Sequence, residues 1–124
     1  ADVFKPGDHG STFGGSCLAI AACAATLSAL VRGDYGEHAA KVGSYMEQAL
    51  AKLPHVVEVR GRGLMLGCNL DDAAGDAHDI VARALAAGVV INATGVHTLR
   101  FLPPLVCEEA DADSLIEILS DVLA

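Results

Sequence analysis

The sequence has 124 residues, of which 52% are hydrophobic and 19% charged, so it can bury a core and lacks the composition of a disordered chain. Its net charge of −8 argues against nucleic acid and against an anionic membrane surface as partners. The four cysteines have no C-x-x-C spacing, and no His/Cys cluster has zinc-site spacing. We therefore expect free thiols in a reducing cytoplasm and no metal site.

The first 15 residues are rich in glycine and include Pro6, so they are predicted to form a loop. The chain starts in this loop without an initiator methionine, which suggests a fragment of a longer protein. A helix is predicted over 16–31, where the residues are apolar nearly all round, with Gly33 as its stop signal. We expect its surplus apolar side to meet another domain or subunit. The predicted organisation is a Gly-rich loop at 1–15 and one domain at 16–124.

A second helix is predicted to follow at once, with Asp34 as its N-cap and Glu37 closing a capping box. Apolar residues then recur on one helical face from Tyr35 to Leu53, and Pro54 ends the helix.

The remaining elements alternate between the period of a strand and that of a helix. They are predicted as strands at 56–60 and 64–70, a helix at 76–87, strands at 89–92 and 98–102, and a helix at about 111–123. Each helix has one apolar face, and the strands offer a sheet on which to bury it. The predicted fold class is therefore α/β, an α+β two-layer sandwich in which a small, mostly antiparallel sheet carries helices on one face.

The segment 7–15 is the first candidate site. Ser11 and Thr12 are two hydroxyls flanked by glycines immediately before a helix, and glycines let exposed backbone amides approach an oxyanion. The same composition also fits a flexible linker with an N-cap, because the run lacks the lysine of a P-loop.

Arg100 is the second candidate, in the apolar strand that precedes Pro103 and Pro104. A guanidinium among apolar neighbours needs a partner, and a carboxylate suits its fork geometry. The alternative is an edge-strand arginine that faces water. Arg60 and Arg62 flank a glycine turn and are interpreted as solvated. No nucleophile–base pair is visible in the sequence, so we predict no catalytic residue.

Three segments in order resemble the class III pyridoxal-phosphate (PLP) aminotransferases, the group that includes the ornithine, acetylornithine and 4-aminobutyrate enzymes. The segments are GDHGSTFGG at 7–15, VRGRGLMLG at 59–67 and LRFLPPL at 99–105. Any one of them is weak, but three in order over nearly the whole chain are specific. Their amino-acid sequences are most similar to those of the acetylornithine enzymes.

The resemblance implies the C-terminal small domain of a fold-type I PLP enzyme, with the large PLP domain absent. Ser11 and Thr12 would bind the PLP phosphate of the neighbouring subunit in a homodimer. Arg100 would pair with a substrate carboxylate, with a glutamate of the large domain as its alternative partner. The family's Schiff-base lysine would lie upstream, since none of Lys5, Lys41 and Lys52 matches its motif.

The implied activity of the parent is transfer of an amino group from N2-acetylornithine to 2-oxoglutarate in arginine biosynthesis, with PLP as cofactor. The fragment alone would be inactive. Two alternatives stay open: another donor (ornithine, succinylornithine or 4-aminobutyrate), or a non-catalytic dimerisation or interaction module.

Overall fold

The computed structural model describes residue 3 and residues 5–124. The chain divides into two compact units, Ala1–Asp34 and Tyr35–Ala124, and each is described by itself. The boundary expected between residues 15 and 16 lies inside the first unit, and residues 1, 2 and 4 of the expected loop lie outside the described residues.

The first unit contains one helix, α1 (Cys17–Arg32), in the part that the structure describes. The helix begins where the Ser16 hydroxyl accepts a hydrogen bond from the Ala19 N–H (3.3 Å), and it ends where the Gly33 N–H donates to the Ala29 carbonyl (2.9 Å). The helix predicted at 16–31 is confirmed. All its residues are exposed, including the large apolar side chains Leu18, Ile20, Leu27 and Val31.

No single helix in the described part of the chain is long and apolar enough to cross a membrane. Within that part, only α1 and the following helix, taken together across the break between them, have the length and apolar composition of a membrane-spanning segment.

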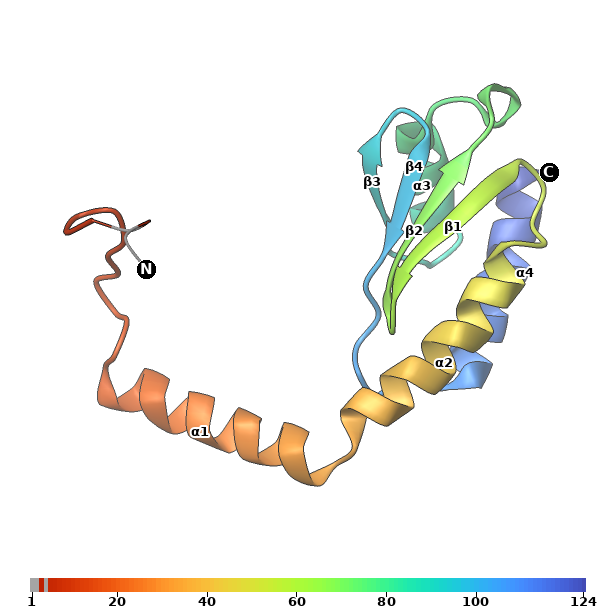
Figure 1. Ribbon diagram of the computed structural model, residues 1–124. Helices are drawn as coiled ribbons and strands as arrows, with labels where there is room; N and C mark the ends of the chain where they lie inside the picture. The colour runs from red at the N-terminus through yellow and green to blue at the C-terminus, as the bar shows by residue number, and fades with distance from the viewer. Residues whose placement is uncertain (1–2, 4) are drawn as a thin grey trace. The chain divides into compact units, whose positions relative to one another are not determined.

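The second unit is a two-layer α/β arrangement (Figure 1). Its elements are α2 (Tyr35–Leu50), β1 (Val56–Arg62), β2 (Met65–Leu70), the 3-10 turn η1 (Asp72–Ala74), α3 (Ala77–Ala86), β3 (Asn92–Gly95), β4 (Thr98–Phe101) and α4 (Glu109–Leu123). The four strands pair antiparallel in the order β1-β2-β4-β3. All three helices contact one another or the same face of the sheet. The predicted fold class is confirmed.

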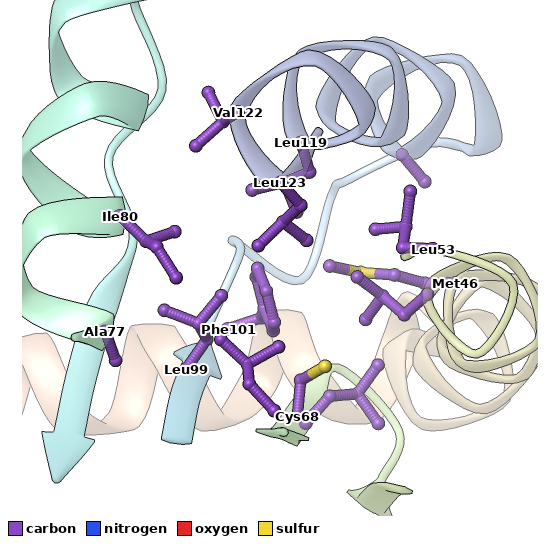
Figure 2. Close-up of a cluster of buried hydrophobic side chains, with 14 residues drawn as sticks. Met46, Leu53, Cys68, Ala77, Ile80, Leu99, Phe101, Leu119, Val122 and Leu123 are labelled. Carbon is purple, nitrogen blue, oxygen red and sulfur yellow. The ribbon is translucent and has the colours of Figure 1, made fainter. Parts of the chain in front are cut away.

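A single apolar cluster joins the sheet to its helices (Figure 2). Cys68 from β2 and Leu99 and Phe101 from β4 point toward Met46 of α2 and Leu119 of α4, and all five are buried. Ile80 of α3 completes the cluster on the side of β3 and β4. Because strand side chains alternate between faces, burial of these positions turns their neighbours to the opposite face.

The start of α2 differs from the prediction. Asp34 has a φ of 48°, in the left-handed region, whereas an N-cap residue adopts extended backbone. Its side chain caps no backbone N–H among the described residues, so the capping box with Glu37 is wrong. A capping box occurs instead at the start of α4, where the Glu108 N–H donates to the Asp111 carboxylate (2.9 Å).

The third strand also differs, since it is Asn92–Gly95 and not 89–92. The end of α3 explains the shift. Gly88, at a φ of 94°, turns the chain so that the Val89 N–H donates to the Ala84 carbonyl (2.9 Å). This bond removes Val89 from sheet pairing, and the apolar residues after it precede the strand.

Candidate functional site

The sheet of the second unit has one face that none of the helices of that unit, α2, α3 and α4, covers. In β2 the residues Leu66, Cys68 and Leu70 are buried, so Gly67 and Asn69 between them lie on the other face. In β4 the buried Leu99 and Phe101 place Arg100 on that face as well. We call it the open face.

Arg100 lies in a row that crosses the open face through all four strands. Gly67 pairs with both Arg60 and Arg100, and Arg100 pairs with Asn92. The Arg100 side chain is exposed and has no hydrogen bond or ion pair to any residue that the structure describes. β4 lies between β2 and β3, so Arg100 is not in an edge strand, and that part of the alternative prediction is wrong. The side chain does face solvent, as the alternative expected.

A second row on the open face carries a hydrogen-bond chain that the sequence did not indicate. The Thr98 hydroxyl donates to the Asn69 amide oxygen (3.0 Å), and the Asn69 amide nitrogen donates to Glu58 Oε2 (2.8 Å). Arg60 Nη1 donates to the same Glu58 oxygen (3.2 Å). Sequence separation hides these contacts, because they join three strands.

Ser11 and Thr12 lie in the first unit, and both are exposed. The Ser11 hydroxyl oxygen accepts a hydrogen bond from the Gly14 N–H (3.0 Å), which leaves its own O–H free to donate to an anion. A Cβ on residue 14 would lie 2.9 Å from the Ser11 Cβ, so this turn requires glycine. The predicted site residues therefore fall into two groups, Ser11 with Thr12 in one unit and Arg100 in the other.

The buried thiols do not add a nucleophile. Burial raises the pKa of Cys68 to about 11. Burial also raises the pKa of Cys107, with a smaller contribution from the charges of Asp111 and Glu108. Within the described residues, no group of three or more His, Cys, Asp or Glu side chains is placed to hold a metal ion.

A hollow of about 640 Å³ lies near α4 in the second unit. It is lined by the segments 88–91 and 101–104 and by residues of α4, mostly through apolar groups. Arg100, the predicted site residue of the same unit, does not line it.

Comparison with known proteins identifies the class. The family model described as aminotransferase class-III matches residues 1–123. An acetylornithine aminotransferase from Caldanaerobacter subterraneus subsp. tengcongensis is 44% identical over 98% of this chain and 32% of its own length. An ornithine aminotransferase from Bordetella pertussis is 42% identical over 98% of this chain and 30% of its own length.

The chain thus belongs to the class-III aminotransferase family, and it spans about a third of the length of these relatives. Among solved structures, the ornithine delta-aminotransferase of Plasmodium falciparum superposes with a TM-score of 0.82 at 31% identity, over 97% of this chain and 32% of that one. The resemblance to the class III aminotransferases is confirmed.

The residues present fit part of a PLP site. A hydroxyl that can still donate, in a glycine turn before a helix, is suitable chemistry for a phosphate group. The chain has three lysines, Lys5, Lys41 and Lys52, and Lys41 forms a surface ion pair with Glu109 (3.0 Å).

Proposed function

We propose that this chain is the C-terminal part of an acetylornithine aminotransferase, a PLP-dependent enzyme that moves the amino group of N2-acetylornithine to 2-oxoglutarate in arginine biosynthesis. Family membership and the acetylornithine relatives support the reaction class and the donor. The observation that carries the proposal is Arg100, whose guanidinium lies on the open face of the sheet and has no partner among the described residues.

Arg100 binds a substrate carboxylate in this proposal. Its planar fork donates two parallel hydrogen bonds to the two carboxylate oxygens, which orients the substrate as well as attracting it. Gly67 beside it has no side chain, so the carboxylate can approach along the sheet. Both the amino donor and the 2-oxo acid acceptor carry a carboxylate, so Arg100 serves both halves of the reaction.

Ser11 and Thr12 bind the PLP phosphate through hydroxyl and backbone N–H groups, and they do so for the neighbouring subunit of a homodimer. PLP, when bound, supplies the electron sink on which amino transfer depends. The lysine that binds PLP lies outside this chain, so the 124 residues alone are inactive. We infer a cytoplasmic enzyme whose partners are small amino acids and 2-oxo acids, with no nucleic acid, membrane or metal.

The test uses the full-length protein loaded with PLP. N-acetylornithine is added without an acceptor, and the visible absorbance of the cofactor is followed. We expect the absorbance to change to that of the aminated cofactor and to return when 2-oxoglutarate is added. Absence of any change with N-acetylornithine, ornithine, succinylornithine and 4-aminobutyrate would contradict the proposal and favour a non-catalytic interaction module.

Ornithine is the second candidate donor, because ornithine aminotransferases are also among the relatives at 42% identity. A response to ornithine with none to N-acetylornithine would keep the reaction class and change the donor.

A further inference from the structure

Glu58 is the only acidic residue in the four strands. It lies on the open face, two strands away from Arg100. Glu58 is in the row of Asn69 and Thr98, which is next to the row that contains Arg100. With strands about 4.8 Å apart and a rise of about 3.3 Å per residue, the two Cα atoms are about 12 Å apart.

On β2, between these two side chains, Asn69 pairs with Glu58 and Gly67 pairs with Arg100. Gly67 has no side chain, and a Cβ built there would meet only Arg60 atoms, at 3.8 Å or more, so no side chain of residue 67 separates Glu58 from Arg100. An extended arginine and an extended glutamate can meet over such a gap, and their opposite charges favour it. An ion pair with Glu58 would occupy the guanidinium that the proposed function assigns to substrate.

The structure holds Glu58 in another place. Its Oε2 accepts hydrogen bonds from Arg60 Nη1 (3.2 Å) and from Asn69 Nδ2 (2.8 Å). The Thr98 hydroxyl donates to the amide oxygen of Asn69 (3.0 Å), and this contact orients the amide so that its NH₂ group faces Glu58.

We propose that Arg60 and Asn69 are positioning residues that hold the Glu58 carboxylate away from Arg100 and so keep Arg100 available to a carboxylate substrate. The inference rests on the proposed function, because it concerns the same substrate-binding arginine. Arg60 acts through Glu58 and does not itself contact the substrate.

The test is Arg60→Gln in the full-length PLP-loaded enzyme, because glutamine keeps the polar stem and removes the charge. Glu58 then competes for Arg100, so the KM for 2-oxoglutarate rises about fivefold, the equivalent of one surface ion pair, while kcat stays within about twofold. The double variant Arg60→Gln/Glu58→Gln restores the KM, because no carboxylate remains to compete. A KM that does not rise, or that stays high in the double variant, overturns the proposal.

Arg62→Gln is the matched control. Arg62 lies on the same strand and face, opposite Met65, and has no ion pair to any described residue. Removing its charge should leave the KM within about twofold. An equal rise in this variant means that total positive charge, not the position of Glu58, controls substrate binding, and it also overturns the proposal.

A crystal structure of the Arg60→Gln variant separates this inference from the proposed function. If the wild-type enzyme transfers no amino group, the proposed function fails, but the position of Glu58 still decides the inference. Glu58 within hydrogen-bond distance of Arg100 supports it. Glu58 still bound to Asn69 overturns it.

Discussion

At the scale of single residues, the neighbours of Arg100 in the strand decide on which face its side chain lies, and the residues around it decide whether its guanidinium has a partner. Burial of Leu99 and Phe101 turns the side chain between them to the open face. There it has no partner among the described residues. The residue type was visible in the sequence, but the missing partner was not.

Replacing Arg100 with alanine in the full-length enzyme should weaken the binding of carboxylate substrates by about 2–5 kcal/mol where the bound substrate excludes water from the pair, because the substrate charge then loses its hydrogen-bonded partner. The measurement is kcat/KM for N-acetylornithine and for 2-oxoglutarate. Arg62→Ala is the control and should change neither value appreciably. Unchanged kcat/KM for both substrates in Arg100→Ala would remove Arg100 from the site.

The four cysteines should divide into two classes in the 124-residue chain. All four are free; Cys17 and Cys23 are exposed, whereas Cys68 and Cys107 are buried and have raised pKa values. Since the thiolate is the reactive form, Ellman's reagent at pH 8 should titrate two thiols in the folded chain and four after denaturation. A Cys17→Ser/Cys23→Ser variant should show none before denaturation, and rapid reaction of that variant would contradict the burial.

At the scale of elements, α2 approaches the β1–β2 connection through two glycines. A Cβ on residue 43 would lie 2.1 Å from the Gly63 carbonyl oxygen, which is backbone and cannot rotate away. Gly63 itself has a φ of 56°, which favours glycine. The helix can therefore pack this closely only without a side chain at position 43.

The substitution Gly43→Ala should lower the free energy of unfolding by about 1–3 kcal/mol, because the new methyl group forces α2 away from the sheet. Urea unfolding of the 124-residue chain, followed by circular dichroism, measures it.

Gly36→Ala is the matched control in the same helix. No heavy atom lies within 4 Å of a Cβ built there, so the higher helix propensity of alanine should stabilise the chain by up to about 1 kcal/mol. If Gly43→Ala did not lower the free energy of unfolding relative to Gly36→Ala, the close approach of α2 to Gly63 would be contradicted.

Element positions were predictable where local chemistry decides them. Ser16 and Gly33 bound α1 through hydrogen bonds to their own helix, and Asp76 caps α3 in the same way by accepting from the His78 N–H (2.8 Å). The prediction failed at Asp34 and at 89–92. In both places the backbone is left-handed, at Asp34 and at Gly88. Glycine commonly adopts this conformation after a helix, whereas aspartate rarely does, and composition does not indicate how far beyond Gly88 the strand begins.

At the scale of the whole molecule, the exposed apolar residues of α1 lead to a prediction about association. Leu18, Ile20, Leu27 and Val31 are all more than half exposed in this structure. Apolar surface of this kind favours contact with another protein surface. The expectation from sequence, that this helix meets another domain or subunit, stays a prediction.

In isolation the 124-residue chain should self-associate, so its mass by static light scattering should rise with concentration. Ile20→Gln/Leu27→Gln, which replaces two apolar positions of α1 by a residue that also favours helix, should lower that rise. A monomer mass at every concentration of the unsubstituted chain would contradict the prediction.

The sequence by itself determined the class of this protein and the nature of its elements. Three motifs in order indicated a class III aminotransferase, and hydrophobic periodicity indicated helices on a small sheet, because both signals are local in the chain. Ser11, Thr12 and Arg100 were likewise proposed as site residues from local pattern.

Only the tertiary structure decided which residues share the open face. The β1-β2-β4-β3 order places Gly67 between Arg60 and Arg100, and it joins Thr98 to Glu58 through Asn69. These relations depend on strand register, which is set by packing between residues distant in the chain, and a shift of one residue would turn Arg100 into the core.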